Sequence, residues 1–230
     1  MGTPIKTNSD LSVETHWEKA AKTRMGKYLT KVETDFISKS IDLAQENIAV
    51  MDVGAEAGRF SVLAANGKAT VVSVDLDAYS LKRLKLKTKQ VNVIQADARR
   101  LPLKGDLFDA VFMIEVLDYI PNIEAAFAEA KRTLKPNASC ILSFGNKSSL
   151  KAKIKAMQGK PYRHSYKEVL QSLSKTGFKI KNKKGYSWLL FGRTSQSPLV
   201  PIFTAIEKYL GLRRVVKFSP WVIIHISKPT

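Results

Sequence analysis

The chain has 230 residues, of which 44% are hydrophobic, so it is long and apolar enough to bury the core of a globular protein. No stretch approaches the roughly 18 to 20 apolar residues of a membrane span, and the opening MGTPIKTNSD lacks the apolar segment of a signal peptide. We therefore expect a cytoplasmic protein. The single cysteine, Cys140, excludes an internal disulfide. The histidines lie too far apart in the sequence for metal-ligand spacing, so we predict no metal site.

Basic residues exceed acidic ones by 38 to 20, which gives a net charge of +18. The excess is uneven, because the segment from Lys147 to Arg193 holds 13 Lys or Arg and one acid, Glu168. A lysine-rich surface that faces only solvent explains this segment as well as a contact with phosphate, nucleic acid or acidic lipid. Both interpretations stay open at this point.

In chain order, the first elements are helical and the next ones alternate. After a loose leader, apolar residues recur every three or four positions from Trp17 to Ile41, which predicts an amphipathic helix or helix pair over 13–45. Five short, continuous apolar runs then alternate with helical patterns over 46–144. Continuous apolar strands are typical of a parallel sheet that is covered on both faces. We therefore predict an α/β fold with a doubly wound sheet.

The remaining residues, 145–230, form a looser pattern. A basic insert with a weak helical stripe (145–164) precedes a predicted helix (165–176), and two further strands flank a long excursion over 189–215. We interpret the whole chain as one domain in three parts. These are a leader and helical cap (1–45), a cofactor-binding half (46–144) and a substrate-side half with the basic insert (145–230).

The stretch IAVMDVGAEAGRF places an acid, Asp52, at the end of the first strand, before a turn through Gly54 and Gly58. Its spacing is G-x-x-x-G rather than the G-x-G-x-x-G of dinucleotide sites, and Glu56 lies within it. Two acids beside this loop would repel a pyrophosphate. S-adenosylmethionine (SAM) has no phosphate and carries a sulfonium and an ammonium, so its positive end suits this loop.

DVGAEAGRF resembles the D-x-G-x-G-x-G motif of the class I, Rossmann-like methyltransferases that use SAM, in particular the small-molecule enzymes related to quinone-precursor methylases. The resemblance implies a seven-stranded, mostly parallel sheet whose last strand is antiparallel. It also implies that Asp52, Gly54 and Gly58 hold the methionine part of the cofactor. Glu56, which we include in the cofactor set, replaces the middle glycine of the family motif.

Three later stretches match the family in order. In TVVSVDLD, Asp75 can accept both ribose hydroxyls, and Leu76 follows it. In VNVIQADARRLPL, the resemblance assigns Asp97 to the adenine amino group, with Ala98 against the ring. In FDAVFMIEVLDYI, Glu115 ends the fourth strand, where ligands bind in open α/β sheets. Glu115 is equally explained by a surface salt bridge.

Methyl transfer by in-line displacement demands no universal catalytic residue, but a hydroxyl or amine acceptor needs a base. Our candidates are Asp118, Tyr119 and His164. Asp118 and Tyr119 replace the Glu-His pair of the family, and tyrosine is a poor base at neutral pH. His164 is also consistent with a solvated loop residue.

The excursion and its surroundings contain large apolar residues close in sequence to Lys and Arg, which suggests an apolar pocket with a cationic rim. These residues are Trp188, Leu189, Leu190, Phe191, Leu199, Val200, Ile202 and Phe203. We expect a small-molecule acceptor that is acidic and aromatic, lipid-like at a membrane surface, or phosphate-bearing. An RNA methyltransferase that uses the 147–193 segment and a non-catalytic SAM-binding protein are the alternatives. A nicotinamide oxidoreductase is disfavoured because the dinucleotide fingerprint is absent.

Overall fold

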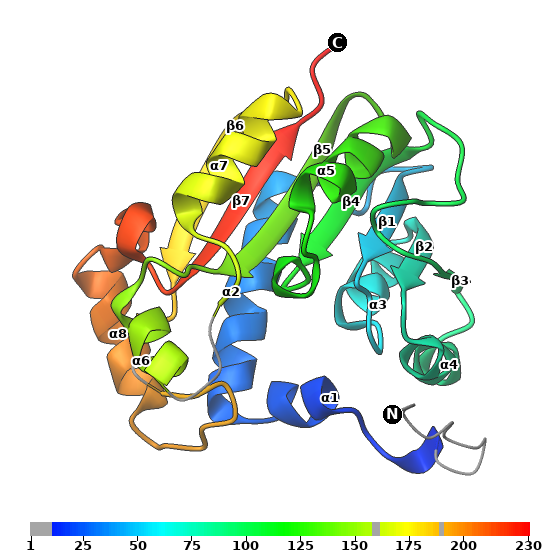
Figure 1. Ribbon diagram of the computed structural model, residues 1–230. Helices are drawn as coiled ribbons and strands as arrows, with labels where there is room; N and C mark the ends of the chain where they lie inside the picture. Colours follow the sequence, from blue (N-terminus) through cyan, green and yellow to red (C-terminus); the bar gives the residue numbers. More distant parts are fainter. Residues whose placement is uncertain (1–10, 158–161, 189–190) are drawn as a thin grey trace.

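A single seven-stranded sheet forms the centre of the protein, whose computed structural model describes residues 11–157, 162–188 and 191–230 (Figure 1). The strands are β1 (Ala49–Val53), β2 (Thr70–Asp75), β3 (Val91–Gln95), β4 (Phe108–Ile114), β5 (Leu134–Gly145), β6 (Lys179–Tyr186) and β7 (Trp221–Ser227). Their order is β3-β2-β1-β4-β5-β7-β6. Strands β1 to β5 pair in parallel, and β7 is antiparallel to β5 and β6. The doubly wound sheet with an antiparallel last strand is therefore confirmed.

Helices cover both faces of the sheet. They are α1 (His16–Ala21), α2 (Arg24–Ser40), α3 (Arg59–Asn66), α4 (Ala78–Lys87), α5 (Ile123–Thr133), α6 (Leu150–Met157), α7 (Tyr166–Lys175) and α8 (Val200–Tyr209). Three short 3₁₀ turns complete the set: η2 (Leu117–Tyr119), η3 (Leu212–Arg214) and η4 (Val216–Phe218). The amphipathic pattern at the start of the chain thus forms a helix pair, as predicted.

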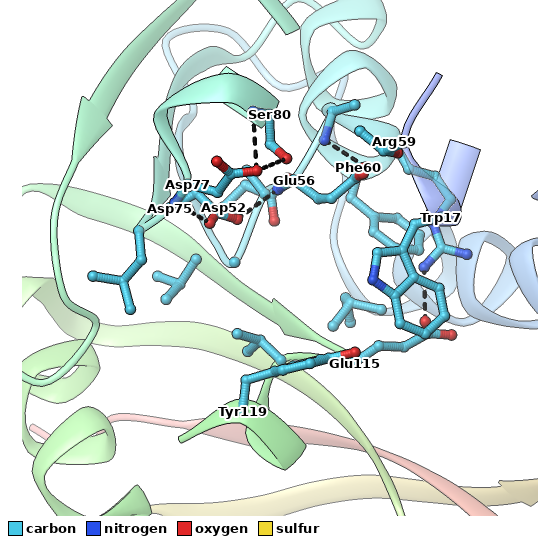
Figure 2. Close-up of a pocket in the computed structure, with 18 of the residues that line it drawn as sticks. Trp17, Asp52, Glu56, Arg59, Phe60, Asp75, Asp77, Ser80, Glu115 and Tyr119 are labelled. Atoms are coloured by element: carbon cyan, nitrogen blue, oxygen red, sulfur yellow. Dashed lines mark hydrogen bonds and ion pairs between the residues drawn. The ribbon is translucent and has the colours of Figure 1, made fainter. Parts of the chain in front are cut away.

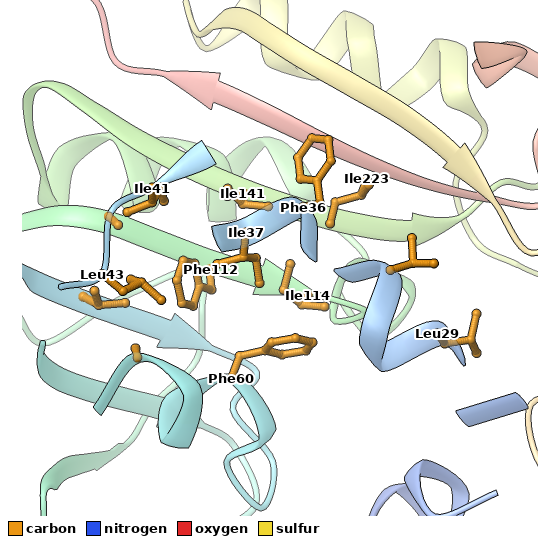
Figure 3. Packing of buried hydrophobic residues seen from close by; sticks show 14 of the residues in the cluster. Leu29, Phe36, Ile37, Ile41, Leu43, Phe60, Phe112, Ile114, Ile141 and Ile223 are labelled. Carbon is orange, nitrogen blue, oxygen red and sulfur yellow. The ribbon is translucent and has the colours of Figure 1, made fainter. Parts of the chain in front are cut away.

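Strand β4 shows why the central strands lack an alternating polar pattern. Phe112 and Ile114 belong to one buried cluster, which includes residues of α2, α3 and α4, and Phe36 and Ile37 of α2 lie there too (Figure 3). Met113 points to the opposite cluster, which α5 and α7 cover. Because both faces of the strand are buried, its positions from Ala110 to Ile114 are all apolar, and the one acid, Asp109, is only partly buried near the start of the strand. Cys140 lies fully buried in the second cluster, where it acts as a small apolar residue.

The N-terminal helix pair is fixed by its caps and by one close approach. Thr15 and Glu18 form a capping box at the start of α1, and the Thr23 hydroxyl accepts the Gly26 amide (3.0 Å) at the start of α2. A Cβ atom on Gly26 would lie 1.9 Å from the backbone oxygen of Ala20. Glycine therefore lets α1 turn sharply away from α2, which brings α1 across the carboxyl edge of the sheet (Figure 1).

No helix among residues 11–157, 162–188 and 191–230 has the length and apolarity to cross a membrane.

We predict that Gly26→Ala lowers the free energy of unfolding by about 1 to 3 kcal/mol, because the added methyl group meets backbone rather than a movable side chain. Chemical denaturation followed by circular dichroism measures the change. Gly192→Ala is the matched control, since a Cβ atom there meets nothing within 4 Å. Equal stabilities of the two variants would contradict the close approach of α1 and α2.

Candidate functional site

A cavity of about 1110 Å³ opens at the carboxyl ends of β1, β2 and β4, and α1 lies across it (Figure 2). This edge is where open α/β sheets bind ligands. Every residue that the sequence analysis assigned to the cofactor lines the cavity, with the exception of Gly58, which lies against Leu84 of α4. The lining members of that set are Asp52, Gly54, Glu56, Asp75, Leu76, Asp97, Ala98 and Glu115.

The glycine loop keeps its turn despite the substitution in the motif. Gly54, Glu56 and Gly58 have φ angles of 72°, 48° and 86°, so all three occupy the left-handed region. For a residue with a Cβ atom this conformation costs roughly 1 to 2 kcal/mol, which explains why the family motif has glycine at the position of Glu56. At Gly58 a Cβ atom would lie 2.1 Å from the side chain of Leu84, so glycine also allows α4 to pack there.

Two buried acids lie beside this loop. Asp52 is 2% exposed and accepts a hydrogen bond from the Ser61 hydroxyl (2.6 Å), and burial raises the pKa of Asp52 to about 6. Oε2 of Glu56 accepts the amide of Ala57 (2.5 Å). Oε1 of Glu56 is buried and has no hydrogen-bond partner among the described residues. Burial also raises the pKa of Glu56. The Thr15 side chain and the charge of Lys87 lower the pKa of Glu56 and so oppose this effect of burial.

Asp75 ties the glycine loop to the end of β2. One carboxylate oxygen accepts the Glu56 amide (2.8 Å) and the other accepts the Asp77 amide (2.9 Å), while the exposed side chain of Leu76 borders the cavity. Each carboxylate oxygen has a second lone pair, so Asp75 can still accept hydrogen bonds from a ligand. Asp97 is held differently, because the guanidinium of Arg99 binds its carboxylate and lowers its pKa.

Glu115 belongs to a buried ion cluster rather than to a surface salt bridge. The residue ends β4 with a φ of 60°, and its carboxylate forms ion pairs with Arg59 of α3 (3.3 Å) and with Arg193. The Arg193 guanidinium lies over the rings of Trp17 (4.4 Å) and Trp221 (5.0 Å). Arg59, Glu115 and Trp17 face the cavity together (Figure 2). Arg59 opens α3, as expected, and also joins the cavity wall.

A second carboxyl group, Glu33 of α2, lies behind this wall and is fully buried. It accepts the Tyr186 hydroxyl (2.6 Å) and lies 3.5 Å from Arg59. Burial and the neighbouring Glu115 raise the pKa of Glu33 to about 8. Burial alone would raise the pKa of Glu115, but Arg193 and Arg59 lower it to about 2. At neutral pH Glu33 is therefore mostly protonated, and Glu115 is the carboxylate whose negative charge pairs with Arg59 and Arg193.

The three candidates for a base lie in different surroundings. Of the three, Tyr119 borders the cavity, and partial desolvation there raises its pKa, so it stays protonated at neutral pH. The Asp118 carboxylate does not line the cavity and accepts a hydrogen bond from the backbone amide of Arg163 (3.1 Å). His164 is not a solvated loop residue. It is buried, and its Nε2 lies within hydrogen-bond distance of the carbonyl oxygens of Leu117 (3.1 Å) and Ile120 (3.0 Å).

The apolar pocket expected from the excursion does not form as predicted. Leu199, Ile202 and Phe203 lie on α8 with their side chains exposed, Val200 is buried under that helix, and none of the four lines the cavity. Leu189 and Leu190 lie outside the described residues. The prediction assumed that the apolar residues of this segment face inward. In the structure the more apolar side of α8 faces outward, and the charged Glu207 is buried.

The apolar part of the cavity wall comes instead from α1, α3 and the end of β4. Trp17, Phe60 and Ile114 lie there, and Lys19 and Lys27 border the same side. The sequence analysis assigned none of these residues to the site. Trp17 is part of the amphipathic helix pattern, and the turn at Lys22 and Thr23, which the close approach of Gly26 to Ala20 allows, brings it over the sheet edge.

Comparisons with known proteins agree with this geometry. Residues 51–142 match the family model described as methyltransferase domain. A sterol methyltransferase-like protein of Botryococcus braunii is 30% identical over 154 residues, which cover 59% of this chain and 40% of that protein. The chain thus spans less than half the length of this curated relative. The match confirms the resemblance to SAM-dependent methyltransferases that the motifs predicted.

Two solved structures share the fold. A geranyl diphosphate methyltransferase in complex with SAM has a TM-score of 0.62 at 16% identity, over 89% of this chain and 86% of its own. The [4+2]-cyclase SpnF has a TM-score of 0.66 at 16% identity, over 89% of this chain and 82% of its own. Residues 51–142 are thus similar to a methyltransferase domain, within a chain that has the Rossmann-like fold of these structures.

Proposed function

We propose that the protein is a SAM-dependent methyltransferase that acts on a small, anionic or lipid-like acceptor. The observation that carries the proposal is the uneven charge of the cavity. Asp52, Glu56, Asp75 and Asp77 line the cavity around the glycine loop. Near α1, Glu14 and Glu18 are paired with Lys22 and with Arg83 and Lys87, while Lys19 and Lys27 border the cavity beside apolar side chains. The carboxylates around the loop suit the cationic end of SAM, and Lys19 and Lys27 suit an anion with an apolar body.

The residues at the acidic end fit the cofactor. Asp52 and Glu56 would hold the ammonium of SAM, and Asp75 would accept the ribose hydroxyls with its remaining lone pairs. Asp97 and Ala98 would lie against the adenine. A pyrophosphate in the same position would meet these carboxylates at close range, which disfavours a dinucleotide.

When bound, SAM supplies a methyl group on a sulfonium, which a nucleophile takes by in-line displacement. The chain's part is to place the acceptor and to exclude water. Trp17 and Phe60 provide apolar cover, and Tyr119 can donate a hydrogen bond because it stays protonated. A carboxylate acceptor has no proton to lose, so it would react without a base. This agrees with the position of His164 away from the cavity.

Lipid-like acceptors receive support from the names of the similar proteins, which refer to a sterol and to geranyl diphosphate. Anionic acceptors receive support from Lys19 and Lys27 at the cavity border. The cyclase SpnF has the same fold, so the fold by itself does not establish methyl transfer, and a non-catalytic SAM-binding protein is the alternative to be tested.

Methyl-labelled SAM and a panel of acceptors test the proposal. Fatty acids, prenyl diphosphates and aromatic carboxylates represent the proposed class, and total RNA represents the alternative. We expect label in the first group. Label in RNA alone would contradict the acceptor class, and SAM binding without transfer to any acceptor would favour the non-catalytic alternative.

We predict that Asp75→Ala weakens SAM binding by about 1 to 3 kcal/mol, because buried polar partners lose their acceptor. Isothermal titration calorimetry measures the change. The control is Asp35→Ala, which removes an exposed carboxylate of α2 that pairs with Lys31 and does not line the cavity. An unchanged dissociation constant in Asp75→Ala would remove this residue from the cofactor site.

The raised pKa of Asp52 predicts a pH dependence. In the free protein the carboxyl is protonated below pH 6, and a cationic ligand binds better once it ionises. SAM affinity should therefore rise about tenfold from pH 5 to pH 7 and then level off. Asp52→Asn should remove most of this rise while still accepting the Ser61 hydroxyl. The same slope in the variant would show that another group titrates.

A further inference from the structure

Helix α8 turns its apolar side to solvent. The residues along one stripe, at spacings of three and four, are exposed: Leu199, Ile202, Phe203, Ile206, Tyr209 and Leu210. Ile202 is 56% exposed and Tyr209 is 91% exposed. On a helix of a globular protein this spacing normally marks the face that packs on the core. Here the stripe has no covering element among the described residues.

The opposite side of α8 holds the polar contacts. Glu207 is 1% exposed, and its carboxylate accepts the Tyr28 hydroxyl (2.5 Å) and the Trp188 amide (3.0 Å). Arg213 forms an ion pair with the same carboxylate of Glu207 at 2.9 Å. These contacts fix the rotation of the helix about its axis. The outward stripe is therefore a stable feature and not the result of a loosely attached helix.

Exposed cations lie on α8, to one side of the stripe, and on the two 3₁₀ turns that follow the helix. They are Lys208 on α8, Arg214 on η3 and Lys217 on η4. The sequence from 169 to 230 contains a single acid, Glu207, against 11 Lys or Arg, and that acid is buried. The surface of this part of the chain thus combines exposed apolar side chains with a positive charge that no carboxylate of residues 169–230 offsets.

Neighbouring elements enlarge the surface. Val215 and Phe218, beside η3 and within η4, are exposed. Helix α6 flanks the same backbone segment as α8, because Lys151 of α6 binds the Ser187 hydroxyl (3.1 Å) next to Trp188. The apolar residues that α6 exposes are Leu150, Ile154 and Met157. In Figure 1 the two helices lie at one end of the molecule.

We propose that this surface, formed by α6, α8, η3 and η4, docks on an anionic lipid bilayer. Apolar side chains on a helix enter the boundary between headgroups and acyl chains, and the nearby cations attract lipid phosphates. A second copy of the chain would place cations against cations across the apolar stripe. A nucleic acid would bind the cations and leave the stripe exposed to water.

The docking surface is joined to the cavity by one segment. Residues 191–197 run from it to the helix pair, where Thr23 donates to the Arg193 carbonyl (3.0 Å) and the Met25 amide donates to Ser195 (3.1 Å). Arg193 itself reaches Glu115 in the cavity wall. A protein seated through α8 would hold the cavity close to the bilayer. The inference does not depend on the reaction that the cavity performs.

Sedimentation with vesicles tests the proposal, using phosphatidylcholine alone and phosphatidylcholine with about one-third phosphatidylglycerol. We expect binding to the anionic vesicles that weakens with salt. Ile202→Ser combined with Ile206→Ser should weaken it at least tenfold, and so should Lys208→Glu combined with Arg214→Glu. Leu86→Ser is the control, because Leu86 is an equally exposed apolar residue (63%) on the distant helix α4.

Melting temperatures of the variants, which should match that of the wild type, exclude misfolding. Failure of the wild type to bind anionic vesicles would overturn the proposal, and so would binding that both double variants retain. Sedimentation velocity measures whether two copies of the chain associate through this surface instead. A dimer that Ile202→Ser with Ile206→Ser converts to monomers, without vesicle binding by the wild type, would assign the surface to contacts between copies and overturn the membrane assignment.

Discussion

The buried ion cluster at the cavity wall holds together three parts of the chain that the sheet alone does not connect. Glu33 comes from the helical cap, Arg59 and Glu115 come from the sheet half, and Arg193 comes from the excursion. Removal of one partner from such a cluster strands a charge in the interior and typically costs about 3 to 5 kcal/mol. The cluster therefore fixes the cap, the cavity wall and the base of α8 relative to each other.

The cofactor end of the site was predictable from sequence because local rules define it. Continuous apolar strands predict a parallel sheet, and acids that follow successive strands must meet at its carboxyl edge. Asp52, Asp75 and Asp97 line the cavity for this reason. The effect of Glu56 on the turn needed the structure. Its backbone adopts the left-handed conformation that the family glycine would adopt, so the loop keeps its shape.

The acceptor end was not predictable, because long-range contacts define it. Arg193 meets Glu115 across 78 positions of the sequence, and the sequence analysis identified Arg193 only as the end of the basic segment 147–193. The apolar residues of the excursion suggested a pocket, but those of α8 face outward, since Glu207 turns inward to Tyr28 and Arg213. His164 shows the same limit. Its buried hydrogen bonds to the η2 segment could not be seen from the sequence KPYRHSY.

The acid-lined loop suits a cation and disfavours a pyrophosphate. Isothermal titration calorimetry of the wild-type protein with SAM, its demethylated product S-adenosylhomocysteine and NADH distinguishes the two kinds of ligand. We expect binding of SAM and S-adenosylhomocysteine and no binding of NADH. Binding of NADH, or of none of the three, would show that Glu56 has changed the loop from a SAM site into something else.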